Sequence, residues 1–210
     1  MSGGTPEWSG PSLSPVGRAL RAFYYRIKPI RANAVTEWLR FRLGGRASPL
    51  VVHLGCGERR LAGAVNIDIR NTPAVDVVCD LLRLPYPTRS VDRIECYHVI
   101  EHLAHSRALL ALARWASMLR DGGSLVIECP NFDEAARDYL AGNRARLGNI
   151  FGLQRFDSDF HLWGWSPSTL AAALREVGLV DVEERQPQDY HAQTEPCMRL
   201  EARVRLQTHE

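Results

Sequence analysis

The stretch Val51-Val52-His53-Leu54-Gly55-Cys56-Gly57-Glu58 decides the fold of this 210-residue chain. A short apolar run ends there in a Gly-x-Gly turn, and two further runs, 64–68 and 76–80, end in Asp68 and Asp80. Ligands of open α/β sheets bind beyond the carboxyl ends of the strands. Three parallel strands would therefore present two carboxylates and a glycine turn, which allows close approach of a ligand, to one crevice. This arrangement predicts a site for a nucleoside-containing cofactor.

Two common nucleotide-binding motifs are missing at this turn. A dinucleotide fingerprint requires a third glycine, G-x-G-x-x-G, and here that position is Arg60. The chain also contains no G-x-x-x-x-G-K-[ST] phosphate loop, which argues against an NTPase. The two missing motifs therefore argue against a dinucleotide and against a nucleoside triphosphate as the ligand of this turn.

The order of the motifs is similar to that of the class I S-adenosylmethionine-dependent methyltransferases. In that family the second strand ends in an acid that binds the ribose and the third in an acid beside the adenine, which Asp68 and Asp80 match. Segments 91–103 and 119–127 resemble the family's fourth strand and the approach to its fifth. The resemblance implies S-adenosylmethionine as cofactor and S-adenosylhomocysteine as product. The implied cofactor contacts are His53, Gly55, Cys56, Gly57, Asp68, Ile69, Asp80, Leu81, Cys96, Tyr97 and His98.

The first crossover is unusually short. Only eight residues, 58–65, separate Gly57 from Asn66, whereas a crossover with a full helix needs at least about 10–12 residues. The first helix is therefore expected to be a single turn or an irregular loop. In this respect the chain resembles a small bacterial subgroup, methyltransferase type 11-like, that is linked to polysaccharide and secondary-metabolite pathways.

The rest of the sequence alternates between strands and helices, as a doubly wound fold requires. Strands are expected near 50–54, 64–68, 76–79, 92–97, 124–129, 179–185 and 198–206. A helix near 106–119 would end at Gly122-Gly123, and another would begin at Ser166-Pro167 and stop at Gly178. The expected fold class is α/β, a Rossmann-like doubly wound sheet of seven strands that ends in an antiparallel hairpin.

Composition indicates a single soluble domain. Hydrophobic residues make up 45% of the chain and charged residues 24%, which is ordinary for a globular protein. No apolar run is long enough for a membrane span, and no secretory signal is recognised. The five cysteines are scattered without a C-x-x-C pair, so neither disulfides nor a cysteine zinc site is expected, and the compartment is expected to be the cytoplasm.

Basic residues are concentrated near the N-terminus. Residues 1–46 carry eight basic and two acidic side chains, a balance of +6 in a chain of net charge +2. Residues 1–15 are rich in Gly, Pro and Ser, which predicts disorder. Residues 16–46 show helical apolar spacing that Pro29 would divide into two basic cap helices, ahead of a domain at 47–210. The basic face is either solvated or a surface for an anionic glycan, phosphate or lipid headgroup, and sequence-specific nucleic-acid binding is not expected.

Methyl transfer requires in-line alignment of the nucleophile, the methyl group and the sulfur. An oxygen nucleophile must also lose its proton, so a base is expected where the fourth strand ends or on a later loop. Histidine titrates near neutrality, which makes His98, His102 and His161 the catalytic candidates, with Glu101 as an orienting carboxylate. Alternatively, the Glu101-His102 pair only shapes the cofactor pocket.

A segment at about 142–165, flexible over 142–154, is expected to cover the substrate. Its tryptophans and acids suit a sugar or an aromatic polyol, because rings pack on apolar faces and carboxylates accept from hydroxyls. The predicted substrate contacts in this segment are Asp157, Asp159, Trp163 and Trp165. Tyr190 and His191, in the loop between the last two strands, are predicted to contact the substrate as well. Alternatively, the tryptophans pack under the following helix. A divalent cation on Asp157, Asp159 and His161 is a further alternative, although metal dependence is not favoured.

Two classes of function follow. The first is an O-methyltransferase acting on a hydroxyl of a sugar, a polysaccharide precursor or a secondary metabolite, with a homodimer left open. N-methylation of a small amine is its alternative, although Cys96-Tyr97-His98-Val99 stands where many amine methyltransferases have a D/N-P-P-Y/F turn. The second class is an adapter that keeps the cofactor fold and binds a partner enzyme through the basic N-terminal helices. The intact glycine turn and both acids favour cofactor binding, and therefore an enzyme.

Overall fold

The structure is a computed structural model in which residues 32–33, 38, 49–155 and 159–206 are described. The chain divides into two units, 1–31 and 32–210, and all described residues belong to the second. The expected disordered segment 1–15 lies outside the described residues, and so do nearly all residues of the expected cap helices.

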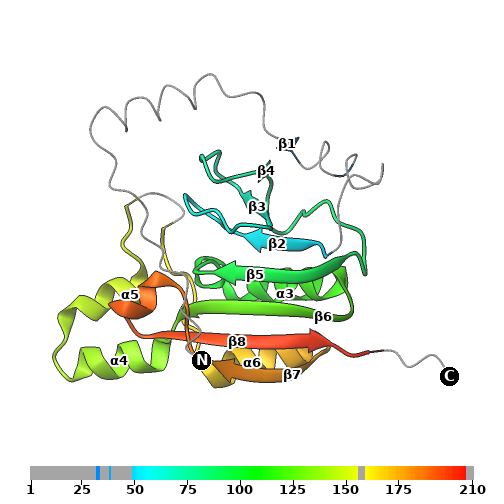
Figure 1. The fold of residues 1–210 in the computed structure, drawn as a ribbon. Coiled ribbons are helices and arrows are strands. Elements are labelled where there is room, and N and C mark those ends of the chain that lie inside the picture. The colour runs from blue at the N-terminus through cyan, green and yellow to red at the C-terminus, as the bar shows by residue number, and fades with distance from the viewer. Residues whose placement is uncertain (1–31, 34–37, 39–48, 156–158, 207–210) are drawn as a thin grey trace, which may run out of the picture. The chain divides into compact units, whose positions relative to one another are not determined.

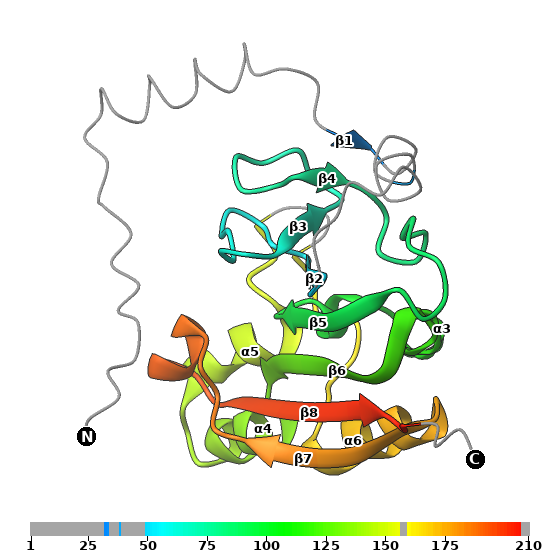
Figure 2. The same ribbon diagram turned by 45° about the vertical axis from the view of Figure 1, so that its right-hand side comes forward.

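Eight strands form one mixed sheet in the order β1-β4-β3-β2-β5-β6-β8-β7 (Figure 1). The strands are β1 (Ala32–Asn33), β2 (Val51–Leu54), β3 (Val65–Asp68), β4 (Val77–Val78), β5 (Val91–Tyr97), β6 (Leu119–Pro130), β7 (Leu179–Arg185) and β8 (Cys197–Val204). Neighbours from β1 to β6 run parallel, whereas β8 runs antiparallel to both β6 and β7 (Figure 2). The seven predicted strands and the antiparallel hairpin are confirmed. The expectation of helices throughout 16–46 is wrong at Ala32–Asn33, which forms the short strand β1 because it pairs with Val77–Val78 of β4.

Helices and short 3-10 turns complete the described elements. They are η1 (Ile100–His102), α3 (His105–Met118), α4 (Phe132–Leu140), η2 (Arg144–Arg146), α5 (Leu147–Phe151), α6 (Pro167–Glu176) and η3 (Tyr190–Gln193). Helices α3 and α6 pack on one face of the sheet, α3 against β6 and α6 against β7 and β8 (Figure 1). Their buried side chains, among them Leu112, Trp115 and Leu174, join the strands in the main core. Helix α6 begins as predicted, with a capping box between Ser166 and Thr169.

Two segments differ from the prediction. The predicted helix at 106–119 is confirmed as α3, but the glycine pair 122–123 does not end it. Leu119 pairs with Val91 and starts β6 at once, and the glycines lie within β6 at a register shift. The segment 142–154, predicted to be flexible, contains η2 and α5. Arg146 ties this segment to its surroundings, with Nε 2.9 Å from a carboxylate oxygen of Asp138 and Nη1 donating to the carbonyl of Thr194.

The crossover from β2 to β3 contains turns and no helix, as predicted from its length. The buried amide of Asn66 organises it. The amide oxygen lies within hydrogen-bond distance of the Leu61 amide and of Nδ1 of His53. The amide nitrogen donates to the carbonyl groups of Leu61 and Ala64 and to Asp76. A saturated buried amide therefore holds the loop that replaces the first helix.

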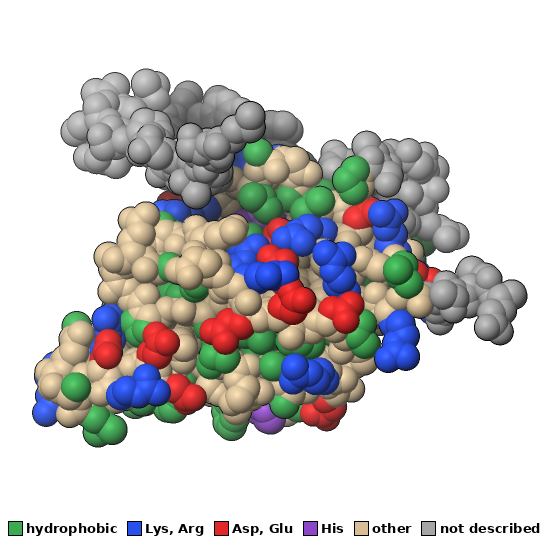
Figure 3. All heavy atoms as spheres, turned by 60° about the horizontal axis from the view of Figure 1, so that its bottom comes forward, with side chains coloured by type: hydrophobic (Ala, Val, Ile, Leu, Met, Phe, Trp, Pro, Cys, Tyr) green, Lys and Arg blue, Asp and Glu red, His purple; other side chains and the backbone are tan. Residues whose placement is uncertain are grey.

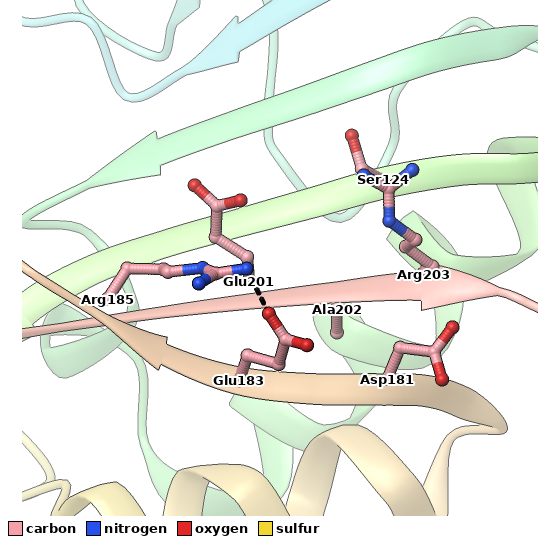
Figure 4. Close-up of a pocket in the computed structure, with 7 residues that line it drawn as sticks. All are labelled: Ser124, Asp181, Glu183, Arg185, Glu201, Ala202 and Arg203. Atoms are coloured by element: carbon pink, nitrogen blue, oxygen red, sulfur yellow. Dashed lines mark hydrogen bonds and ion pairs between the residues drawn. The ribbon is translucent and has the colours of Figure 1, made fainter.

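The sheet face opposite α3 and α6 carries charged side chains. Alternate residues of β5, β6 and β8 point to it and form ion pairs among Arg93, Glu95, Glu128, Arg199 and Glu201. A polar hollow over β6, β7 and β8 is lined by Ser124, Asp181, Glu183, Arg185, Glu201, Ala202 and Arg203 (Figure 4). Parallel sheets covered on both faces have apolar strands, so this alternation is a departure from the usual pattern.

The view in Figure 3 shows basic and acidic side chains interspersed on one side of the molecule. That side therefore lacks the one-signed basic surface on which nucleic-acid binding depends. Among the described residues, none of the helices has the length and apolar character needed to cross a bilayer.

Candidate active site

The parallel strands end together at one edge of the sheet, at a point where the winding reverses. From β2 the chain moves outward to β3 and β4, and it then returns to β5 on the other side of β2. Open α/β sheets bind their ligands at such a switch point. The loops after β2, β3, β4 and β5 hold the glycine turn, Asp68, Asp80 and His98.

The two glycines of the turn adopt the left-handed backbone conformation. Gly55 has φ +66° and Gly57 has φ +54°, which other residues rarely adopt. A Cβ on residue 55 would overlap the side chain of Val99, which follows β5. The amide of Gly57 donates to Oδ2 of Asp68 at 2.8 Å. The turn is therefore held closely against the loops that follow both neighbouring strands.

The two acids lie side by side at the ends of β3 and β4. Asp68 is buried and accepts hydrogen bonds from the backbone amides of Gly57 and Arg70. Asp80 is half-buried, and its Oδ1 accepts from the amide of Leu82 at 2.9 Å. The amide of Cys79 donates to the carbonyl of Asp68 at 3.0 Å, which joins the two strand ends. Because a carboxylate has about four acceptor sites, both acids keep capacity for a ligand.

Other predicted cofactor contacts differ in their exposure to solvent. Ile69 is 63% exposed, whereas Cys56 and Cys96 are buried. Burial raises the pKa of the Cys56 thiol to about 12 and that of Cys96 well above its usual value, so both remain thiols at neutral pH. Leu81 packs against the core, and its carbonyl accepts from the indole of Trp115 at 3.0 Å.

His53 and Tyr97 lie on the charged face of the sheet, with their rings 5.4 Å apart. Nδ1 of His53 is bonded to Asn66, and burial lowers the pKa of this imidazole. The hydroxyl of Tyr97 donates to Glu95 at 2.6 Å, and burial, reinforced by that carboxylate, raises its pKa. Nδ1 of His53 and the hydroxyl of Tyr97 are thus already engaged within the protein.

The residues predicted to serve proton removal come together after β5. Glu101 is 2% exposed, and its Oε1 lies 3.4 Å from Nδ1 of His98. The rings of His102 and His161 meet edge to face, with centroids 4.9 Å apart. One potential ligand atom each from Glu101, His102 and His161 lies within 4.8 Å of the other two.

The histidines differ in protonation. Burial by itself would lower the pKa of His98, but Cys197 and Glu101 hold it at about 10, so this side chain is a cation at neutral pH. The buried carboxylate of Glu101 would likewise have a raised pKa, but His98 brings it to about 2. Burial lowers the pKa of His161, which is therefore neutral at pH 7. Of these two histidines, His161 has the protonation state that a general base needs.

The loop between β7 and β8 is anchored at the same edge by a residue that sequence reasoning missed. Glu128 is fully buried near the end of β6 and accepts from the amides of Gln188, at 2.9 Å, and Asp189, at 2.7 Å. Its carboxylate also pairs with Arg199 at 3.3 Å. The signal was available, because Glu128 ends an apolar run as Asp68 and Asp80 do.

The loop also connects the glycine turn to the histidines. The guanidinium of Arg59 lies 3.2 Å above the ring centroid of Tyr190. The ring of His191 stacks on Tyr190 at 3.8 Å and on His98 at 3.9 Å between centroids. Tyr190 and His191, both predicted substrate contacts, therefore stand between the predicted cofactor and catalytic residues.

The two tryptophans of the predicted cover segment have different surroundings. Trp163 is 42% exposed and its ring lies 4.3 Å from that of His105. Trp165 is 1% exposed in the main core, and its indole donates to the carbonyl of Ile100. Only Trp163 therefore presents an accessible ring, and Trp165 packs as the alternative reading of the sequence expected.

The acids of this segment are not equally informative. Asp157 lies outside the described residues. Asp159 is buried and paired with Arg155, whose Nε and Nη2 donate to its two oxygens at 2.9 and 3.1 Å.

Two surface hollows, the one in Figure 4 and another bordered by Gly122 and Leu206, lie on other parts of the sheet.

Residues 58–127 match the family model of a methyltransferase domain. Over this third of its length the chain resembles that methyltransferase domain, and its sheet has the Rossmann-like fold of solved SAM-dependent methyltransferases. The matched segment begins just after Gly57 and runs through β3, β4 and β5 into β6. It includes Asp68, Asp80, His98 and His102. Among curated protein sequences, none matches this chain significantly.

Solved structures of methyltransferases share the fold of this chain. A SAM-dependent methyltransferase from Archaeoglobus fulgidus is 15% identical, with a TM-score of 0.53 over 87% of this chain and 98% of that chain. One from Methanosarcina mazei is 11% identical, with a TM-score of 0.57 over 79% and 98%. Human N-acetylserotonin methyltransferase, solved in complex with SAM, is 16% identical, with a TM-score of 0.51 over 75% of this chain and 48% of that chain.

Proposed function

We propose that this domain binds S-adenosylmethionine beyond the carboxyl ends of β2 to β5 and transfers its methyl group to a hydroxyl oxygen of a small molecule or glycan. The observation that carries the proposal is the convergence, at one switch point, of a glycine turn, two strand-end acids and a histidine cluster. The first two suit a nucleoside, and the third suits the removal of a proton.

Cofactor binding would use groups whose hydrogen-bonding capacity is not exhausted. The carboxylates of Asp68 and Asp80 each accept from backbone amides and can also accept from ribose hydroxyls or an adenine amino group. Gly55 and Gly57 leave the backbone uncovered, so that the ligand can approach it closely. S-adenosylmethionine then supplies the methyl group and leaves as S-adenosylhomocysteine.

In the transfer, the acceptor oxygen forms a bond to the methyl carbon while the carbon–sulfur bond breaks and its electron pair stays on sulfur. The acceptor proton has to leave, and His161 is favoured as its recipient over His98, whose imidazole is protonated at neutral pH. Its Nδ1 lies 2.8 Å from the carbonyl of Asn149, which assigns the proton to that nitrogen and leaves a lone pair on Nε2. A positioned base of this kind contributes about 10²–10⁴-fold to the rate.

A sugar or another ring-shaped polyol is the acceptor class we favour. Trp163 and Phe160 are each about two-fifths exposed, at 42% and 41%, and the carbonyl of Phe160 lies 3.0 Å from Nδ1 of His102. Exposed aromatic faces pack against the apolar faces of sugar rings and leave the hydroxyls free for hydrogen bonds. The proposal also includes that the protein acts in the cytoplasm and has a role in biosynthesis.

Calorimetric titration with S-adenosylmethionine and S-adenosylhomocysteine, with NAD as a negative control, tests the cofactor. Wild-type protein should bind both sulfur nucleosides, and Asp80→Ala should weaken binding at least about tenfold, since it removes a ligand acceptor that holds only one backbone amide. Glu184→Ala, on exposed β7, is the matched control and should bind normally. Absence of binding to the wild type would overturn the proposal and favour the adapter alternative.

Transfer of labelled methyl groups to a panel of hydroxylated acceptors tests the reaction. His161→Ala should lower kcat by about 10²-fold or more while cofactor affinity changes only a few-fold. Label found on amine acceptors alone would overturn O-methylation and leave cofactor binding intact.

A further inference from the structure

Glu101 is a buried acid whose carboxylate has an ion pair with His98 but accepts no hydrogen bond from the described residues. The side chain is 2% exposed, and neither carboxylate oxygen has a hydrogen-bond donor among the described residues. The contact with His98, at 3.4 Å, is an ion pair of poor hydrogen-bond geometry that reaches only Oε1. Buried carboxylates are normally hydrogen-bonded or bound to a cation, because an ion without partners is costly in a low-dielectric interior.

Two histidines face this acid with their tautomers set by the backbone. Nδ1 of His102 lies 3.0 Å from the carbonyl of Phe160, and Nδ1 of His161 lies 2.8 Å from the carbonyl of Asn149. A carbonyl only accepts, so each Nδ1 carries the proton and each Nε2 keeps a lone pair. Histidines that bind metals nearly always donate their other ring N–H in this way.

The spacing is also that of a metal site. The ligand atoms of Glu101, His102 and His161 all lie within 4.8 Å of one another. Three ligands about 2.0–2.2 Å from one tetrahedral ion stand about 3.3 Å apart, so small side-chain rotations would close the site.

We propose that Glu101, His102 and His161 form a binding site for one divalent transition-metal ion of the zinc or cobalt type, beside the proposed methyl acceptor. Two imidazoles and one carboxylate favour such an ion over magnesium, which prefers an all-oxygen shell. Three protein ligands leave a coordination position open, as in catalytic rather than structural sites.

The site's role rests on the proposed function, whereas ion binding itself does not. An acceptor hydroxyl at the open position would be acidified by the ion, as metal-bound water is, and its proton would pass to solvent water. The resulting alkoxide would then attack the methyl carbon. With the ion bound, His161 is a ligand and no longer the proton acceptor.

A second group of possible metal ligands lies nearby, and comparison with it shows why the ion is expected at Glu101. Ligand atoms of His98, Asp189 and His191 also lie within 4.8 Å of one another. In this second cluster, however, the carboxylate of Asp189 already accepts from the ring of His191, at 2.5 Å, and from the backbone amide of His191. Its hydrogen-bonding needs are met within the protein, so an ion is expected at Glu101 instead.

Titration of chelator-treated full-length protein with Co²⁺ and Zn²⁺ tests the site, followed by calorimetry and by the visible absorption of bound Co²⁺. Wild-type protein should bind one equivalent. His102→Ala and the milder His102→Gln should each weaken binding at least about tenfold, as should His161→Ala. His105→Ala and His191→Ala are the matched controls and should bind as the wild type does.

Failure of the wild type to bind Co²⁺ and Zn²⁺ would overturn the proposal. So would unchanged affinity in all His102 and His161 variants, or loss of binding in His191→Ala alone. Thermal unfolding and S-adenosylmethionine binding of each variant report folding independently of the ion. Cobalt binding without cofactor binding would support the metal site and contradict the proposed function, so the two failures are distinguishable.

Discussion

The side chain of Val99 fills the space that a side chain on residue 55 would need. Gly55→Ala should therefore both overlap Val99 and strain a backbone with φ +66°. We expect a loss of about 2–4 kcal/mol in the free energy of unfolding and at least tenfold weaker S-adenosylmethionine binding. Urea unfolding and calorimetry measure the two effects.

Gly63→Ala separates strain from overlap. Gly63 has φ +77°, but a Cβ there would meet nothing within 4 Å. Gly63→Ala should therefore lose only the cost of backbone strain, about 1–2 kcal/mol in the free energy of unfolding, and should bind the cofactor normally. Equal effects of the two substitutions would mean that the contact between the two loops is unimportant.

Glu128→Gln should loosen the loop between β7 and β8. The buried carboxylate accepts from two backbone amides, and a glutamine side chain would bring its own NH₂ group against donors. We expect a loss of about 1–3 kcal/mol in stability and faster hydrogen exchange at residues 188 and 189. Glu183→Gln, in an exposed ion pair, should change stability by no more than about 0.5 kcal/mol. Unchanged exchange in Glu128→Gln would contradict the anchoring role.

Trp163 and Trp165 should respond differently to truncation. Trp165→Ala removes a core side chain that is 1% exposed and should cost about 3–5 kcal/mol of stability. Trp163→Ala should leave the unfolding temperature nearly unchanged and raise KM for the acceptor, because its ring is 42% exposed. Unfolding and steady-state kinetics check both, and an unaltered acceptor KM would remove Trp163 from the substrate site.

Asp76 should make stability depend on pH. Burial would raise the pKa of this carboxylate, but Arg60 and the amides of Asn66 lower it overall. Because the folded pKa lies below the unfolded value, the stabilisation is present above about pH 4 and is lost as pH falls through the folded pKa. The stability difference between wild type and Asp76→Asn should therefore shrink between pH 6 and pH 3.

Urea unfolding across that pH range measures the difference. Glu184→Gln, exposed on β7, is the control and should show almost no difference at any pH. A constant difference for Asp76→Asn would mean that its carboxylate charge does not contribute.

Much of the candidate site could be predicted because its signals are local. Gly55, Gly57, Asp68 and Asp80 each follow a short apolar run, and parallel strands bring such ends to one edge. Glu101 and His102 are neighbours in sequence. The missing first helix followed from the eight-residue spacing alone.

Other features depend on contacts between distant residues. The carbonyl that orients His102 belongs to Phe160, 58 positions away, and the amides held by Glu128 are 60 and 61 positions away. The order in segment 142–154 likewise depends on Arg146 reaching Thr194. No local pattern encodes such pairs.

The sequence by itself determined the positions of seven strands, the glycine turn and the acids at the strand ends, because periodicity and strand ends are properties of short segments. Tertiary structure decided which histidine nitrogens carry protons, which tryptophan is accessible and that Glu101 lacks donors. Those properties arise from packing and desolvation, which exist only once distant segments meet.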